Sequence, residues 1–267
     1  MKMPNLNTEM IDGPEARAAQ QTADRFGEPG FEDPAAFFIA QRYDGYSEEN
    51  QETWQTLFDR QMEFLADRAS NVYLDGARAI KLVRDHIPHL EGEQSINRFL
   101  RELTGWQSRA VPGYLPAKAF FACLAERSFP TTIVIRSKEA IDYLPEPDIF
   151  HDVFGHVPML TDPVYADYMQ EYGRAGWKAM RYNRLKALGS LYWYTVEFGL
   201  LQEADGIKAY GAGILSGPTE VVYATEAESP NRIMLNVDRV MRTDYVISDL
   251  QPTYFVIESF EDLYRQT

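Results

Sequence analysis

The 267-residue sequence predicts an α+β fold that is mostly helical, with a few short strands. Three observations support this class: apolar residues recur at helical spacing over much of the chain, β-branched runs are short, and no internal repeat divides the sequence. Apolar residues make up 45% of the chain, enough for one large core. We therefore expect a single domain over residues 36–267, preceded by a flexible arm over residues 1–35, which is polar and interrupted by Gly and Pro.

Each predicted helix carries its own start, stop or periodic signal. Ser47 is a candidate N-cap, and Trp54, Phe58, Met62 and Leu65 follow it at helical spacing. Further helices are expected over residues 71–84, 95–105, 116–129, 162–180 and 183–202.

Strands are expected where short β-branched or aromatic runs lie between turn signals. The clearest is "TTIVIR" over residues 131–136. Two more, over residues 244–249 and 253–259, flank Pro252 near the C-terminus.

Composition excludes several classes of function. The 26 basic residues against 40 acidic ones give a net charge of −14, which argues against a nucleic-acid surface and favours a small-molecule partner. No apolar run reaches the roughly 18 residues that span a bilayer, and the N-terminal segment lacks the apolar stretch of a secretory signal. Cys123 is the only cysteine, so an internal disulfide and a thiolate metal cluster are excluded, and a cytoplasmic location is expected.

Two of the four histidines stand in "PEPDIFHDVFGHVPML", at His151 and His156. On a regular helix, positions five apart diverge by roughly 140°, so this is not the i, i+4 pair of zinc proteases. The two imidazoles can converge on one ion if a short helix loosens at Gly155 before Pro158. The alternative is that both are ordinary core or capping histidines.

Glu197 is the only charged residue between Lys186 and Glu203, and it lies in the apolar run "SLYWYTVEFGLL". A buried carboxylate needs a partner, which is either a distant arginine or a metal held with His151 and His156. Two imidazoles and one carboxylate without sulfur suit non-haem Fe(II), with zinc as the competitor.

Beyond these residues, "LTGW", "VPGYLP", "YLPEPDIFHDVFGHVPML", "YWYTVEFGL", "IKAYGAGILS" and "ESPNR" occur in one order. From about Leu103 to Phe260 the chain therefore resembles the pterin-dependent aromatic amino acid hydroxylases, specifically their single-domain bacterial phenylalanine 4-hydroxylase branch. The resemblance implies a single catalytic domain that uses Fe(II), a tetrahydropterin and O₂ to hydroxylate an aromatic ring, converting L-phenylalanine to L-tyrosine.

The resemblance also implies a role for each matching position. The metal ligands and catalytic centre would be His151, His156 and Glu197. The residues implied around the pterin are Val111, Gly113, Leu115, Phe120, Asp152 and Glu146. The residues implied around the substrate are Arg136, Pro147, Trp193, Phe198, Gly213 and Ser216. Taken singly, Phe120 and Trp193 read as core aromatics, and Arg136 reads as the partner of Asp142 on the surface.

Two departures from the family's pattern bear on the substrate. Gly217 and Pro218 follow Ser216 where a second serine is common, and Ile133 and Val134 stand where close relatives often carry tryptophan. Tryptophan 5-hydroxylation, phenylalanine 3-hydroxylation, a His₂Glu zinc hydrolase and a non-catalytic binding protein remain alternatives. We expect a monomer, because the chain lacks the family's regulatory domain and tetramerisation helix.

Overall fold

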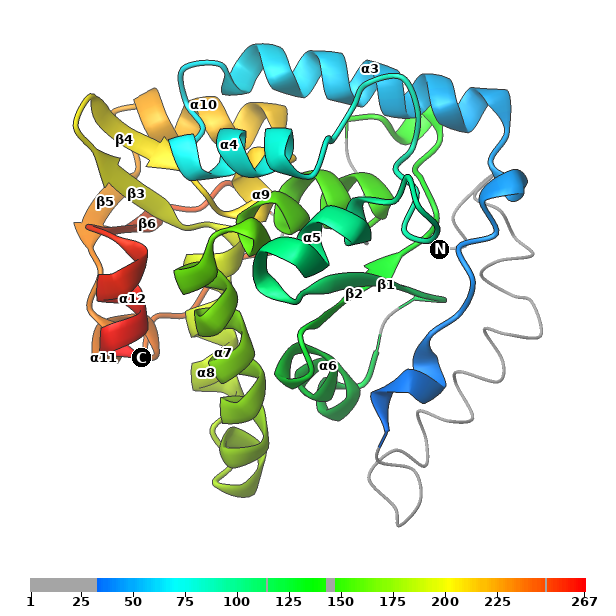
Figure 1. Cartoon of the computed structure of the whole chain (residues 1–267). Coiled ribbons are helices and arrows are strands. Elements are labelled where there is room, and N and C mark those ends of the chain that lie inside the picture. Colours follow the sequence, from blue (N-terminus) through cyan, green and yellow to red (C-terminus); the bar gives the residue numbers. More distant parts are fainter. Residues whose placement is uncertain (1–32, 114, 143–146, 248) are drawn as a thin grey trace.

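The computed structural model describes residues 33–113, 115–142, 147–247 and 249–267. Helices dominate, and two small sheets lie on opposite sides of the central helices, so the predicted α+β class is confirmed (Figure 1). Most of the predicted arm, residues 1–32, lies outside the described residues. Within the described part, no helix combines the length and apolarity needed to cross a bilayer.

The helices include ten α-helices among the described residues. They are α3 (Glu48–Leu65), α4 (Asn71–Ala79), α5 (Ile96–Thr104), α6 (Ala117–Ala125), α7 (Pro163–Arg181), α8 (Leu185–Tyr192), α9 (Ala212–Leu215), α10 (Pro218–Glu226), α11 (Val237–Val240) and α12 (Phe260–Gln266). Four 3-10 helices are η1 (Pro34–Phe37), η2 (Tyr43–Gly45), η3 (Lys138–Ala140) and η5 (Val157–Thr161). Two π-helices are η4 (Phe150–His156) and η6 (Trp193–Glu197).

Local capping explains where the helices begin and end. Ser47 caps α3 as predicted: its hydroxyl accepts the N–H of Asn50, whose side chain in turn accepts the N–H of Ser47. Gly105, at a φ of 76°, ends α5 as predicted. The helix predicted over residues 71–84 is shorter, because Lys81 takes a left-handed conformation just after α4. The helix predicted over residues 183–202 was also too long, because α8 passes into η6 and then into a strand.

The strands form two sheets. In the first, β1 (Gln107–Val111) pairs in parallel with β2 (Ser128–Thr132). In the second, the strand order is β4-β3-β6-β5, with β3 (Leu200–Glu203), β4 (Gly206–Ala209), β5 (Asn231–Met234) and β6 (Thr253–Ile257). The β3–β4 pair is antiparallel, whereas β6 runs parallel to β3 and β5.

Two strand predictions need correction. Only Thr131 and Thr132 of the predicted strand 131–136 belong to β2, because the segment that follows bonds to the approach to η4 instead of to a strand. There the N–H of Ile149 donates to the carbonyl of Val134 at 2.8 Å. The strand predicted over residues 244–249 is absent from its described residues, whereas the strand near Thr253 is confirmed as β6.

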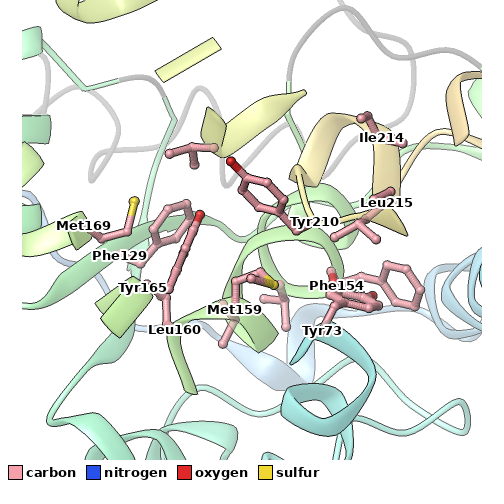
Figure 2. Packing of buried hydrophobic residues seen from close by; sticks show 14 of the residues in the cluster. Tyr73, Phe129, Phe154, Met159, Leu160, Tyr165, Met169, Tyr210, Ile214 and Leu215 are labelled. Carbon is pink, nitrogen blue, oxygen red and sulfur yellow. Dashed lines mark hydrogen bonds between the residues drawn. The ribbon is translucent and has the colours of Figure 1, made fainter. Parts of the chain in front are cut away.

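The core surrounds η4 and η5, so the segment that carries both candidate histidines is buried on most sides. Figure 2 shows Phe154 and Met159 of this segment among Tyr73 of α4, Tyr165 of α7 and Tyr210, which follows β4. The Tyr73 hydroxyl donates to the carbonyl of Phe154 at 2.8 Å. Fully buried aromatic packing of this kind holds the main chain of η4 in one position.

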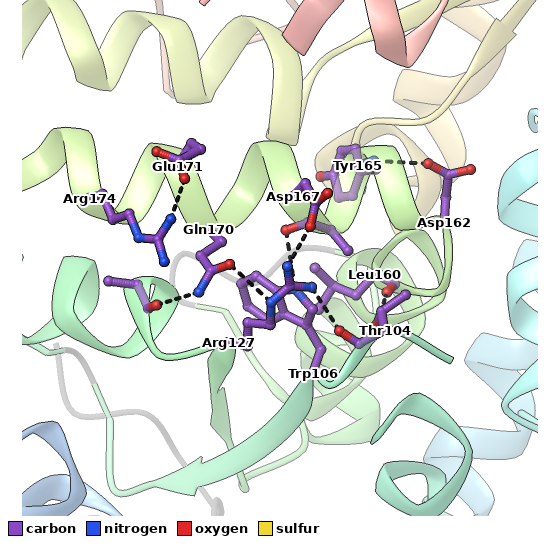
Figure 3. Close-up of polar contacts among 12 residues, drawn as sticks. Thr104, Trp106, Arg127, Leu160, Asp162, Tyr165, Asp167, Gln170, Glu171 and Arg174 are labelled. Carbon is purple, nitrogen blue, oxygen red and sulfur yellow. Dashed lines mark hydrogen bonds and ion pairs between the residues drawn. The ribbon is translucent and has the colours of Figure 1, made fainter. Parts of the chain in front are cut away.

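Arg127 joins the β1–β2 sheet to α7 (Figure 3). Its Nη1 donates to the carbonyl of Thr104 at 2.7 Å, its Nε donates to Gln170 Oε1 at 3.0 Å, and its Nη2 pairs with Asp167. Nearby, the indole N–H of Trp106 donates to the carbonyl of Ala166 at 3.1 Å. These contacts fix the small sheet against the helices.

Glycine permits the close packing of α6 on α7. A Cβ added at Gly173 would lie 2.4 Å from the main-chain nitrogen of Ala125, so Gly173→Ala should lower the free energy of unfolding by about 1–3 kcal/mol. Gly189→Ala in α8 is the control, since its Cβ would meet nothing nearer than the Tyr245 hydroxyl at 3.7 Å. Urea denaturation should show Gly189→Ala unchanged or more stable by up to about 1 kcal/mol. An equal loss of unfolding free energy in Gly173→Ala and Gly189→Ala would contradict the packing argument.

Candidate active site

The two candidate histidines lie on one face of the π-helix η4. Hydrogen bonds in a π-helix join residues five apart, so each turn is wider than in an α-helix and positions i and i+5 come close together. His151 Nε2 and His156 Nε2 are 3.2 Å apart. The expected loosening at Gly155 is not what brings them together. Gly155 instead allows a close approach, because a Cβ there would lie 3.0 Å from the Cβ of Ala212 in α9.

Glu197, at the end of the second π-helix η6, meets both imidazoles. Its Oε1 is 3.2 Å from His156 Nε2, and its Oε2 is 3.6 Å from His151 Nε2. Burial favours the neutral acid, but the opposing effects of His156 and His151 prevail and lower the pKa of Glu197. No arginine pairs with this carboxylate among the described residues. Two nitrogens and an ionised carboxylate therefore converge at one point, a donor set that fits a divalent metal.

Ser216 orients the first imidazole. Its hydroxyl donates to the carbonyl of Ala212 at 2.8 Å, so toward His151 Nδ1, 2.9 Å away, it acts as an acceptor. The proton of His151 is thereby held on Nδ1, and the lone pair of Nε2 faces Glu197 and His156. Burial lowers the pKa of His151 to about 4, so the ring is neutral at physiological pH, as a metal ligand must be.

Asp152 is a second carboxylate close to the pair. Its ligand atoms and those of His151 and His156 lie within 4.8 Å of one another. Its Oδ2, however, already accepts the N–H of Thr132 at 2.7 Å, and burial raises its pKa to about 7. Glu197 has the lower pKa and contacts both rings, so geometry and charge favour Glu197 as the third ligand, with Asp152 beside it.

Arg136 lies in a buried ion pair with Asp148. The guanidinium donates from Nε to Oδ2 at 2.8 Å and from Nη2 to Oδ1 at 2.9 Å, and the Asp148 side chain is 0% exposed. The surface partner considered for Arg136, Asp142, pairs instead with Arg60 at 2.5 Å. Asp148 Oδ1 also accepts the N–H of His151 at 3.0 Å, so one carboxylate holds both the guanidinium and the start of η4. The remaining Arg136 nitrogen, Nη1, has only a 3.5 Å contact to the carbonyl of Ile141.

A cavity of about 910 Å³ opens over this cluster. Every candidate site residue in the described part of the chain lines it: Val111, Gly113, Leu115, Phe120, Arg136, Pro147, His151, Asp152, His156, Trp193, Glu197, Phe198, Gly213 and Ser216. Glu146, the remaining candidate, lies outside the described residues.

Sequence reasoning missed part of the lining. Phe129, whose ring centroid is 4.7 Å from that of His156, lines the floor of the cavity. The missed residues toward the C-terminus are Thr219, Glu220, Ile247, Asp249 and Leu250. Ile247 and Asp249 lie in the segment that was predicted as a strand, and none of the five residues stands in a motif that indicated a binding role. Asp148 was missed as well, because it stands between Glu146 and Asp152 and so, unlike Glu197, is not a lone charge in an apolar run.

Comparison with known proteins connects this geometry to a family. A family model described as biopterin-dependent aromatic amino acid hydroxylase matches residues 42–267. The chain belongs to this family. The match covers both π-helices and the whole cavity lining, so in this hydroxylase the cluster of imidazoles and carboxylate lies within the shared region.

Curated relatives and solved structures agree with that assignment. A phenylalanine-4-hydroxylase of Ralstonia nicotianae is 48% identical over 231 residues, which cover 86% of this chain and 73% of the relative. One from Caulobacter vibrioides is 49% identical over 229 residues, covering 86% of this chain and 77% of the relative. A crystal structure of phenylalanine hydroxylase from Chromobacterium violaceum, with bound iron(III) and 7,8-dihydrobiopterin, is 42% identical and superposes with a TM-score of 0.83, covering 92% of this chain and 88% of that one.

The buried ion pair gives a stability prediction. Asp148→Asn leaves the Arg136 guanidinium buried without a counter-charge and should lower the free energy of unfolding by about 3–5 kcal/mol. Asp142→Asn is the matched control, because the Asp142 side chain is 83% exposed and its pair with Arg60 should contribute less than about 1 kcal/mol. Thermal and denaturant unfolding of both variants would measure the difference, and equal effects would contradict it.

Proposed function

We propose that this hydroxylase converts L-phenylalanine to L-tyrosine, using ferrous iron, a tetrahydropterin and O₂. The observation that carries the proposal is the convergence of His151, His156 and Glu197, within 3.2–3.6 Å of one another, under a cavity with aromatic walls. The C. violaceum relative, which binds iron and phenylalanine in one crystal structure, supports the choice of metal and substrate.

The metal would be held by His151, His156 and Glu197. When bound, iron and the pterin together supply the activation of O₂ that ring hydroxylation requires. The chain contributes a fixed donor set, because Ser216 and Asp148 hold the ring and the main chain of His151. A site formed by only three protein ligands leaves coordination positions for oxygen and solvent.

The pterin would lie against Phe120, which lines the cavity, with Val111, Gly113 and Leu115 beside it. A flat heteroaromatic ring stacks favourably on a phenyl face. We assign Asp152 to the polar edge of the pterin, because its carboxyl group faces the cavity and burial raises its pKa to about 7. Glu146 is retained as a pterin contact in this proposal.

The amino acid would be held at both ends. Arg136 would bind its carboxylate, with Nη1 as the nitrogen that Asp148 leaves open. Trp193, Phe198 and Pro147 would enclose the ring, while Gly213 and Ser216 form the wall beside Glu197. Gly213 suits that position because a Cβ there would lie 2.8 Å from the ring of Phe198. Trp193 packs on Phe198 with ring centroids 4.7 Å apart.

We also propose that the enzyme is a cytoplasmic monomer. The single cysteine, Cys123, is buried, which supports a compartment where no disulfide is needed. Light scattering behind a sizing column would test the oligomeric state.

Oxygen uptake tests the function directly. With ferrous iron, tetrahydropterin and L-phenylalanine, the protein should consume O₂ and release L-tyrosine, identified by chromatography. Glu197→Gln should reduce tyrosine formation by at least about 100-fold, because an amide neither carries the charge nor binds iron strongly. Meta-tyrosine as the main product from L-phenylalanine would contradict para-hydroxylation, and so would hydroxylated tryptophan as the main product when both amino acids are supplied. Full tyrosine formation by the Glu197→Gln variant would contradict the ligand assignment.

Removing the hydroxyl that orients His151 should weaken iron binding. Ser216→Ala leaves Nδ1 without its acceptor, so the dissociation constant for Fe(II) should rise about 10- to 100-fold. Competition with a chromophoric chelator measures this constant without turnover. Ser229→Ala, which removes an exposed hydroxyl bonded to Tyr223, is the control and should bind iron as the parent protein does.

A further inference from the structure

Trp193, which forms one wall of the cavity, is held by three partners. Its ring stacks on Tyr245 with centroids 4.5 Å apart and planes at 15°, and it packs on Phe198 at 4.7 Å. Its indole N–H donates to Oε1 of Gln251 at 3.0 Å. Two of these partners, Tyr245 and Gln251, come from the C-terminal segment that also supplies Ile247, Asp249 and Leu250 to the cavity. We call residues 244–247 and 249–251 the rim segment.

The side chain of Gln251 has every polar group engaged, although no function assigned above uses it. Its Nε2 donates to the carbonyl of Val246 at 2.6 Å and to that of Asp249 at 3.1 Å, while Oε1 accepts from Trp193. An indole N–H can only donate and a main-chain carbonyl can only accept, so the amide orientation is fixed by its partners. Gln251 is 1% exposed, and its removal would leave these groups unpaired.

The same residue ties the rim segment to α10. Its main-chain N–H donates to Glu220 Oε1 at 3.3 Å, and that oxygen also accepts the hydroxyl of Tyr254 in β6. Glu220 itself lines the cavity, four residues beyond Ser216. Gln251 therefore connects three parts of the site: the cavity wall formed by Trp193, the rim segment and α10, the helix that begins at Pro218.

We propose that Gln251 is a positioning residue for ring selection: it fixes the position of the Trp193 indole within its ring plane, and with it the width of the substrate pocket. The inference rests on the proposed function only in that the ligand is an aromatic amino acid. Stacking on Tyr245 sets how deeply the indole lies but allows it to slide or turn in its own plane. The hydrogen bond to Gln251 removes that freedom, because it anchors one edge of the ring.

A fixed wall favours the smaller ring. In this proposal the anchored Trp193 indole leaves a space suited to a phenyl group. Once released, the wall can withdraw and admit the larger indole of L-tryptophan. Loss of Gln251 should therefore narrow the preference for L-phenylalanine over L-tryptophan without altering the iron donor set, which lies on η4 and at the end of η6.

Hydrogen exchange at the indole groups tests the anchor without iron, pterin or turnover. The chain has four tryptophans, so four indole signals are expected in a ¹H–¹⁵N spectrum. Trp54 and Trp106 donate to the main-chain carbonyls of Val83 and Ala166, and Trp177 is 41% exposed. In Gln251→Leu, exchange should become about tenfold faster at Trp193 and stay unchanged at Trp54 and Trp106.

Binding measures the effect on ring selection. Calorimetry on the Fe(II)-loaded protein without oxygen gives dissociation constants for L-phenylalanine and L-tryptophan. The binding ratio, defined as the dissociation constant for L-tryptophan divided by that for L-phenylalanine, should fall by roughly threefold to tenfold in Gln251→Leu. Gln55→Leu is the matched control, because the Gln55 amide also donates to a main-chain carbonyl, that of Asp85, but lies away from the cavity. In Gln55→Leu, both the exchange rate at the Trp193 indole and the binding ratio should match those of the parent protein.

Two further variants separate anchoring from general damage. Gln251→Asn keeps an amide but is one methylene too short to reach the indole. It should therefore also speed hydrogen exchange at the Trp193 indole and lower the binding ratio, and it replaces Gln251→Leu as the test if that variant does not fold. In a Trp193→Phe background, which lacks the N–H, Gln251→Leu should change the binding ratio less than twofold.

Unchanged indole exchange at Trp193 would overturn the proposal, and so would faster exchange with an unchanged binding ratio. A parent protein that discriminates between the two amino acids but forms no tyrosine would refute the proposed function instead, while the binding ratio of the variant still decides this inference.

Discussion

The structure depends on one electrostatic constraint: a buried carboxylate and two imidazoles lie closer than 4 Å to one another. Glu197 remains ionised there because His151 and His156 face it and their effect on its pKa outweighs that of burial. The surrounding groups serve this arrangement. Ser216 fixes the tautomer of one ring, and Asp148 holds the main chain beneath it.

Two π-helices make that arrangement geometrically possible. A π-turn costs hydrogen-bond quality relative to an α-turn, and such turns occur most often at functional sites. Here one brings two imidazoles five positions apart onto the same face, and the other ends at the carboxylate. The aromatic core around Phe154 and Tyr73 provides the packing that keeps η4 in this unusual form.

Much of the fold could be predicted from the sequence because its signals are local. The Ser47 capping box and the Gly105 terminator depend on a few neighbouring residues, and α3 and α5 begin or end where these residues stand. The short strands β1 and β5 could not be predicted, because their pairing comes from distant segments. The local hairpin of β3 and β4 was missed because its first residues were assigned to the predicted helix over residues 183–202. At the site, residue chemistry identified Glu197 and the histidines. The i, i+5 spacing was explained incorrectly by a loosened helix, since periodicity arguments assume 3.6 residues per turn. Gln251 gave no signal, because its long-range partners, Trp193 and Glu220, lie on η6 and α10.

The shared oxygen of Asp148 has a consequence for how the two halves of the site communicate. Oδ1 accepts from the Arg136 guanidinium and from the main chain of His151. A carboxylate ligand that draws the guanidinium toward itself therefore acts on the same acceptor that holds the start of η4. Thermodynamic reciprocity then requires that any change such a ligand makes in cation affinity at the imidazoles is matched by an equal change in the affinity for the ligand when the cation is bound.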